Sequence, residues 1–146
     1  MRAIVIREFG PPDVLRLEEV PTPEPGPGEV LIKVHAVSVN RTLDTVVRAG
    51  KYVRRVTLPL VPGVDPSGVV AKLGPGVTCR KVGDRVVTQL RVREPTDTEP
   101  PRLLGVHTWG GYAEYELGTS FDAQLKTQIS GFFPSGAIRS LPSSSG

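Results

Sequence analysis

The chain is poor in cysteine, in aromatic residues and in long apolar runs. It has 146 residues, of which one is a cysteine, Cys79, and 5% are aromatic. A single cysteine excludes a disulfide framework within the chain and any zinc site built from several cysteines. The first seven residues alternate instead of forming the apolar run of a signal peptide, and no window approaches the about 20 apolar residues of a membrane span. We therefore expect a cytoplasmic protein that does not enter a membrane.

Charge of one sign is not concentrated anywhere in the chain. The formal net charge is +3, and the lysines and arginines are scattered among aspartates and glutamates. Modules that bind nucleic acid usually combine a basic patch with aromatic residues on which bases stack. We therefore expect no nucleic-acid partner and interpret most of these charges as solvated surface.

The sequence also lacks the glycine pattern of a dinucleotide-binding fold. That pattern, Gly-x-Gly-x-x-Gly between a strand and a helix, brings backbone amides and a helix N-terminus to the pyrophosphate. The Gly-Pro-Gly segments at 26–28 and 74–76 have proline in the turn and no third glycine. We expect no nucleotide site within these 146 residues.

Glycine and proline, in contrast, are abundant. The chain has 16 glycines and 15 prolines. They separate short runs rich in β-branched residues, a pattern typical of a mainly β protein with many tight turns. The expected strands are residues 3–6, 14–20, 29–39, 68–73, 85–90 and 111–117, and residues 91–105 are expected to form a polar loop.

The hydrophobic period changes after the longest of these strands. Asn40 is suited to the N-cap of a helix because its side-chain oxygen can accept a hydrogen bond from a free amide of the first turn. Leu43, Val46 and Val47 follow at helical spacing, and Gly50 lies where a left-handed C-terminal cap is favoured. We expect a helix of two to three turns here.

Composition divides the chain into two parts. Residues 1–117 carry the strand and helix signals and form one domain. Residues 118–146 are rich in serine, and their apolar residues follow no period. Such a composition is typical of a disordered tail.

Five segments of the domain resemble a known family in their order along the chain. They are residues 25–34, 39–52, 62–70, 82–86 and 110–115. Together they resemble the N-terminal, GroES-like domain of the medium-chain dehydrogenase/reductase superfamily, in its zinc-free quinone oxidoreductase-like branch of the alcohol dehydrogenase family. The resemblance covers residues 1–117. It implies a mainly β fold, a partly open β-barrel with one or two short helices, followed by an irregular C-terminal tail.

The resemblance also implies a domain without zinc. A catalytic zinc needs about three ligands of the Cys, His or carboxylate type. Asn40 stands where zinc-dependent relatives carry a cysteine, and Gly63-Val64-Asp65 replaces their Gly-His-Glu. Residues 91–105 contain no cysteine, so the four-cysteine structural zinc site of those relatives is missing too. We assign no residue to a metal.

Zinc-free relatives reduce a quinone or enone by hydride transfer from NADPH, which implies roles for residues around the expected helix. Tyr52 is a candidate to polarise or protonate the substrate; the alternative is an ordinary packed tyrosine. Asn40 is a candidate to orient the substrate or the nicotinamide amide, against simple capping. Asp44 is a candidate to brace the helix end or the site, against a solvated position. Arg48 and Lys51 are candidates to bind the nucleotide phosphates; the alternative is that both are charged residues that face solvent.

Two hypotheses of function follow from the resemblance. In the first, the chain is the substrate-binding half of an NADPH-dependent quinone or enone oxidoreductase, which needs a nucleotide domain; NADPH is not expected to bind this chain alone. In the alternative, it is a non-enzymatic fragment, truncated, frameshifted or alternatively spliced, that acts as a binding or regulatory module. Both predict an exposed interdomain face, and hence self-association.

Overall fold

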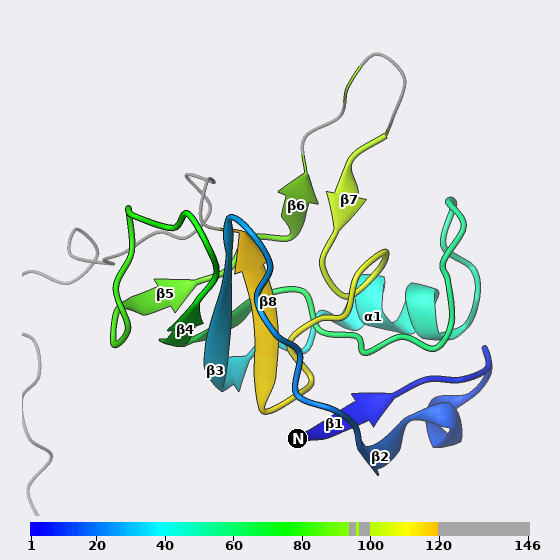
Figure 1. Cartoon of the computed structure of the whole chain (residues 1–146). Coiled ribbons are helices and arrows are strands. Elements are labelled where there is room, and N and C mark those ends of the chain that lie inside the picture. Colours follow the sequence, from blue (N-terminus) through cyan, green and yellow to red (C-terminus); the bar gives the residue numbers. More distant parts are fainter. Residues whose placement is uncertain (94–95, 97–99, 120–146) are drawn as a thin grey trace, which may run out of the picture.

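The computed structural model describes residues 1–93, 96 and 100–119. Within these ranges the chain forms short strands, one α-helix and one 3-10 helix (Figure 1). In order they are β1 (Arg2–Val5), η1 (Pro12–Val14), β2 (Arg16–Glu19), β3 (Glu29–Val37), α1 (Arg41–Arg48), β4 (Pro66–Leu73), β5 (Arg85–Val87), β6 (Arg91–Arg93), β7 (Arg102–Leu103) and β8 (Tyr115–Thr119). The mainly β class with short helices is confirmed, and the described strands form three sheets without a closed barrel.

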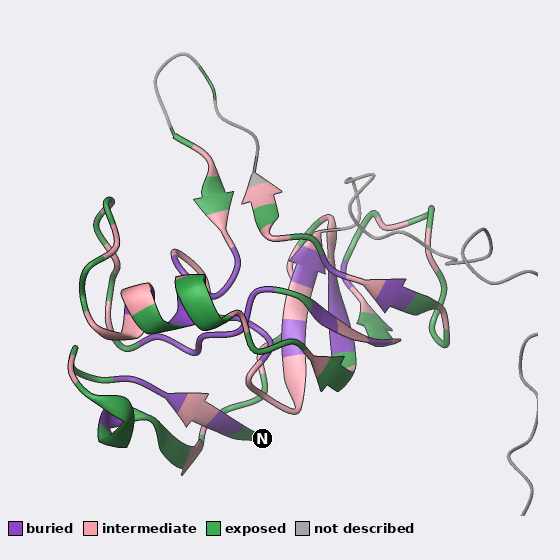
Figure 2. Ribbon diagram, turned by 180° about the vertical axis from the view of Figure 1, so that it is seen from behind, coloured by how far each residue is buried: buried purple, intermediate pink, exposed green. Residues whose placement is uncertain are grey.

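A four-stranded antiparallel sheet is the centre of the domain. Its strand order is β5-β4-β3-β8. Ile32 in β3 pairs with Val70 in β4 on one side and with Glu116 in β8 on the other. Figure 2 shows the buried stretches of these strands in purple. Ile32 and Val70 form a core with Val30 and Val86, all at most 3% exposed.

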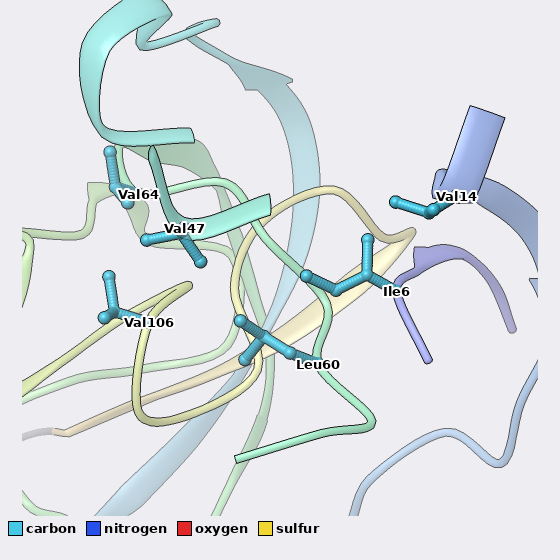
Figure 3. Packing of buried hydrophobic residues seen from close by; sticks show 6 residues of the cluster. All are labelled: Ile6, Val14, Val47, Leu60, Val64 and Val106. Atoms are coloured by element: carbon cyan, nitrogen blue, oxygen red, sulfur yellow. The ribbon is translucent and has the colours of Figure 1, made fainter. Parts of the chain in front are cut away.

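A second core lies beside the sheet, beneath α1. Figure 3 shows its buried members, which come from the N-terminal segment, the helix and two irregular segments. They are Ile6, Val14, Val47, Leu60, Val64 and Val106. Full burial of a side chain of this size stabilises a fold by about 1.5–3 kcal/mol. The helix is thus held mainly by packing, since eight residues are too few for a stable isolated helix.

Both ends of α1 are formed by the residues that the sequence predicts. The Asn40 side-chain oxygen accepts a hydrogen bond from the Leu43 amide at 2.9 Å, which confirms the N-cap. Gly50 follows the helix with φ of 70°, a left-handed conformation that a residue with a Cβ rarely adopts. A Cβ on Gly50 would also lie 2.8 Å from the Phe9 ring.

The prediction of a polar loop at 91–105 is wrong. β6 and β7 pair as an antiparallel two-stranded sheet within it, and Leu104 is fully buried. The charged residues of this stretch obscured the apolar positions 92, 103 and 104, each of which faces inward at least in part. Alternating burial of this kind needs few apolar residues when the strand is short.

The last strand is also displaced from its predicted position. It was expected at 111–117, but β8 begins at Tyr115 because the preceding residues pair with an irregular segment instead: the Gly110 amide donates to the Val61 carbonyl at 2.7 Å. β8 continues to Thr119, so the proposed boundary at 117 falls inside a strand. Residues 120–146, most of the predicted tail, lie outside the described residues. No helix in the described ranges is long and apolar enough to cross a membrane.

Candidate functional site

Three segments far apart in the sequence meet at the start of α1. The first is the turn from β3 into the helix, the second is residues 62–65, and the third is residues 110–112. The second and third are joined by backbone hydrogen bonds, from the Gly111 amide to the Gly63 carbonyl and from the Tyr112 amide to the Pro62 carbonyl, both 2.9 Å. Each segment belongs to one of the motifs that carry the family resemblance.

Gly63 makes this close approach possible. It has φ of 97°, and a Cβ built on it would lie 2.7 Å from both the backbone nitrogen and the ring of Tyr112. Contacts below 3.0 Å essentially never occur for real Cβ atoms. No other residue type therefore fits at position 63 without displacing Tyr112.

The Tyr112 hydroxyl is connected to the helix start through Asp44. It donates a hydrogen bond to Asp44 Oδ2 at 2.6 Å. The same carboxylate oxygen accepts from the Asn40 backbone amide at 2.8 Å. We call this arrangement the Tyr112–Asp44–Asn40 chain. Asp44 is 9% exposed and therefore does not lie on a solvated helix face, and it is hydrogen-bonded at the helix start; a role in the site stays a prediction.

Asn40 has one polar side-chain atom left for a ligand. Its Oδ1 is used by the helix cap, whereas its Nδ2 makes no hydrogen bond to any described residue. The residue is half-buried, and the adjoining Val39 is 79% exposed. A fixed N–H donor beside an exposed apolar side chain can bind a molecule that presents a carbonyl oxygen on a hydrophobic frame.

Tyr52 packs at the edge of the second core. Its ring lies 6.1 Å from the His107 ring, centroid to centroid, at an interplanar angle of 68°. Its hydroxyl makes no hydrogen bond within the described part of the chain, so it is available as a donor. A chemical role for Tyr52 stays a prediction, because the structure shows packing for the ring and leaves only the hydroxyl free.

His107 is a neighbour of Tyr52 that the sequence did not indicate. Its Nδ1 accepts a hydrogen bond from the Leu103 amide at 3.1 Å, while its Nε2 is buried without a partner among the described residues. Burial lowers the pKa of His107, and the nearby Arg54 and Arg102 lower it further. A neutral ring with the proton on Nε2 is consistent with both contacts.

Arg48 is engaged in a structural contact. Its guanidinium donates to the Gly10 carbonyl, and the Gly10 amide donates to the Arg48 carbonyl at 3.1 Å. These contacts join the end of α1 to the loop after β1. A role of Arg48 toward nucleotide phosphates stays a prediction, as does that of the exposed Lys51.

The positions where zinc-dependent relatives carry ligands are occupied by other side chains. Val64 is fully buried in the second core, and Asp65 accepts a hydrogen bond from the Ser38 hydroxyl at 3.1 Å. Among residues 1–93, 96 and 100–119, no three His, Cys, Asp or Glu side chains gather as a metal site would require. A zinc-free site stays a prediction.

Glu116 is a second buried carboxyl that the sequence did not indicate. It is 2% exposed, and its Oε1 accepts a hydrogen bond from the Thr88 hydroxyl, while its Oε2 has no partner in the described part. Burial raises the pKa of Glu116 to about 7, against a smaller lowering by the Thr88 hydrogen bond. Only the pairing of Glu116 with Ile32 reveals that it faces the interior.

Two surface hollows have volumes of about 420 Å³ each. One borders β8 and includes Trp109, Tyr115 and Leu117; the other includes Val34 and Tyr112. Neither is lined by Asn40 or Tyr52. The second hollow is connected to the candidate site only through Tyr112.

Comparison with known proteins identifies the family of this domain. The family model "Alcohol dehydrogenase GroES-like domain" matches residues 26–123. A quinone oxidoreductase from Rattus norvegicus is 42% identical over 118 residues, which cover 80% of this chain and 31% of that relative. The chain thus spans about a third of the length of this relative.

Solved structures give the same fold. The crystal structure of an NAD-dependent alcohol dehydrogenase superposes with a TM-score of 0.77 at 38% identity, over 87% of this chain and 39% of that one. A cobalt- and zinc-bound thermostable alcohol dehydrogenase from Pyrobaculum aerophilum gives 0.74 at 38% identity, over 82% and 39%. The chain belongs to the alcohol dehydrogenase GroES-like domain family, the N-terminal domain of medium-chain dehydrogenases/reductases.

Proposed function

We propose that this chain is the carbonyl-binding half of an NADPH-dependent quinone or enone oxidoreductase without zinc. The observation that carries the proposal is the Asn40 side chain, whose oxygen is fixed by the helix cap and whose Nδ2 has no hydrogen-bond partner among the described residues. Kinship to quinone oxidoreductases and alcohol dehydrogenases supports an oxidoreductase. A cytoplasmic location, self-association through the exposed interdomain face and the absence of a nucleic-acid partner remain part of the proposal.

The chemistry asks for hydrogen-bond donors at the substrate oxygen. When a carbonyl is reduced, negative charge develops on its oxygen, and a preorganised N–H or O–H stabilises that charge. Asn40 Nδ2 is the proposed donor to this oxygen. The free Tyr52 hydroxyl is the proposed proton source for the oxygen or the adjacent carbon. In a zinc-dependent relative a metal ion performs the polarisation that we assign to Asn40.

The described residues do not fit a dinucleotide. They contain no glycine-rich turn between a strand and a helix, and Arg48 is engaged with Gly10. We therefore propose that the hydride donor is held by a nucleotide-binding domain outside these residues. NADPH is the proposed donor on the resemblance to quinone oxidoreductases, although an NAD-dependent enzyme is among the similar structures.

The test is titration of the ¹⁵N-labelled chain with cyclohexanone, followed by NMR. A saturated ketone is chosen because quinones and enones would add to the exposed Cys79 thiol. The expected result is millimolar binding that shifts the Asn40 side-chain amide. Asn40→Asp keeps a capping oxygen but removes the N–H donor, and we expect its affinity to fall about tenfold, the loss of about 1.4 kcal/mol.

Equal affinity of wild type and Asn40→Asp, with both folded, would contradict the proposal. Two companion measurements on the same sample are calorimetric titration with NADPH and a zinc assay. We expect neither NADPH binding nor bound zinc. If the chain alone binds NADPH, the tail or an oligomer completes a nucleotide site, and the enzyme hypothesis then holds for this chain by itself. If it binds no carbonyl but captures a defined macromolecule, the binding-module alternative becomes the better account.

A further inference from the structure

We propose that Tyr112 is a positioning residue of the carbonyl site, which acts through Asp44 to fix the direction of the Asn40 N–H donor. The inference rests on the proposed function for the identity of the ligand. The hydrogen bonds that connect Tyr112, Asp44 and Asn40 do not depend on it. Tyr112 lies 68 residues after Asp44 in the chain and does not belong to the helix or to the strand before it.

The first step is that one oxygen atom of Asp44 accepts two hydrogen bonds. Asp44 Oδ2 accepts from the Tyr112 hydroxyl at 2.6 Å and from the Asn40 amide at 2.8 Å, whereas Asp44 Oδ1 is buried without a partner among the described residues. The orientation of this carboxylate is therefore set by two donors on one side. Without Tyr112, only the Asn40 amide would hold it.

The second step is the way in which Asn40 is held. Its backbone amide is tied to Asp44, and its Oδ1 is tied to the Leu43 amide at 2.9 Å. The residue has an extended backbone, with φ of −82° and ψ of 94°, and its carbonyl accepts the first hydrogen bond of the helix from the Asp44 amide at 2.9 Å. Three contacts therefore hold Asn40 and with it the direction of Nδ2, and the bond from its own amide depends on the position of the Asp44 carboxylate.

The third step is the rigidity of Tyr112. Its amide donates to the Pro62 carbonyl at 2.9 Å, its carbonyl accepts from the Ile4 amide at 2.7 Å, and its ring lies against Gly63. Burial, and then the Asp44 hydrogen bond, raises the pKa of Tyr112 well above its usual value. The phenol thus remains an O–H donor throughout the range in which the protein would work. Because these contacts fix the position of Tyr112, its hydroxyl can restrain Asp44.

The test compares Tyr112→Phe with Tyr115→Phe. Both substitutions remove only a hydroxyl, but the Tyr115 hydroxyl makes no hydrogen bond to the described residues, so this variant is a matched control. In Tyr112→Phe we expect cyclohexanone affinity to fall about fivefold. We also expect the NMR signals of the Asn40 side-chain amide to shift, and ¹⁵N relaxation to show that this amide has become more mobile. Tyr115→Phe should leave the cyclohexanone affinity and the Asn40 signals unchanged.

A purely structural Tyr112 would lower stability and leave the Asn40 signals and the cyclohexanone affinity as in wild type; that result overturns the inference. If wild type does not bind cyclohexanone, the proposed function fails, and the ligand-free Asn40 signals of Tyr112→Phe decide the inference by themselves. If Tyr112→Phe does not fold, Asp44→Ala tests the same link because it removes the acceptor of both hydrogen bonds. We expect its Asn40 side-chain amide signals to shift, and unchanged signals contradict the inference.

Discussion

The two buried carboxyls of this domain differ in the number of donors that reach them. Asp44, 9% exposed, accepts hydrogen bonds from two groups in two separate segments, the Asn40 amide and the Tyr112 hydroxyl. Glu116, 2% exposed, accepts a hydrogen bond from the Thr88 hydroxyl alone among the described residues. Burial is similar, so the partners decide what each group does. Asp44 connects segments at the candidate site, whereas burial raises the pKa of Glu116.

The two groups also differ in energy. Asp44 receives two hydrogen bonds, and hydrogen bonds to a charged group are about twice as strong as neutral ones. For Glu116, burial raises the pKa from 4.5 to about 7. A rise of this size corresponds to about 3 kcal/mol of lost stability when the group is ionised. Four variants test this difference between the two carboxyls and their surroundings.

The largest loss of stability is expected for Gly63→Ala, which removes the space that the Tyr112 ring and amide occupy next to residue 63. The added Cβ would meet the Tyr112 amide at 2.7 Å on a backbone with φ of 97°. We expect a loss of roughly 3 kcal/mol in urea unfolding. Gly76→Ala is the control, since Gly76 also has positive φ, 77°, but no atom within 4 Å of the added Cβ. Equal losses in the two variants would show that steric contact with Tyr112 is unimportant.

Glu116→Gln should remove a pH dependence. The folded pKa of about 7 is above the unfolded value of 4.5, so the stability of the neutral carboxyl is fully present below 4.5 and is lost as the pH rises through about 7. Relative to wild type, the variant should therefore gain up to about 3 kcal/mol between pH 4 and pH 9. The measurement is urea unfolding at both pH values. A constant difference would mean that Glu116 ionises freely in the folded protein.

Asp44→Asn replaces the other buried carboxyl by an amide. We expect it to lower the stability of the fold, whereas Glu116→Gln raises it at high pH. The amide oxygen can still accept from Asn40 and Tyr112, but the bonds lose their charge assistance, at a cost of about 1–2 kcal/mol at pH 8. Thermal unfolding of this variant beside Glu116→Gln makes the comparison direct. Stabilisation by both substitutions would show that the number of donors does not distinguish the two sites.

Thr88→Val should have the smallest effect. It removes the hydrogen bond that Glu116 receives, at a cost of about 1 kcal/mol. Because that hydrogen bond lowers the pKa of Glu116, its loss should also move the pH-dependent decrease in stability to higher pH. The check is the pH profile of unfolding beside that of wild type. An unchanged midpoint would mean that the Thr88 hydroxyl does not influence the carboxyl.

Local signals account for the features that the sequence predicted correctly. The Asn40 cap and the Gly50 terminus lie within a few residues of the helix that they bound, so their types and spacing sufficed. The longest strand was equally evident, because apolar residues predominate from Val30 to Val37, with only Lys33 and His35 between them. The family resemblance added the order of the motifs, and with it the fold.

Contacts between distant segments account for what was missed. Asp44 was recognised as a candidate, but its partner Tyr112 lies 68 residues away, and the contact of Arg48 with Gly10 spans 38. The burial of Glu116 depends on the register of β8 against β3, which no local pattern specifies. The pairing of β6 with β7 was hidden in the same way, by charged residues on short strands.

The distance in sequence between Tyr112 and Asp44 has a consequence for the order of folding. A contact across 68 residues carries a larger loop-closure cost than the turns of a helix, so it forms late. The helix can begin to form as soon as its own residues exist, but its first turn is fastened only when the chain has been made as far as Tyr112. During synthesis, therefore, the Tyr112–Asp44 contact can form only after residue 112 has been made, just as the second core is completed only after Val106 has been made.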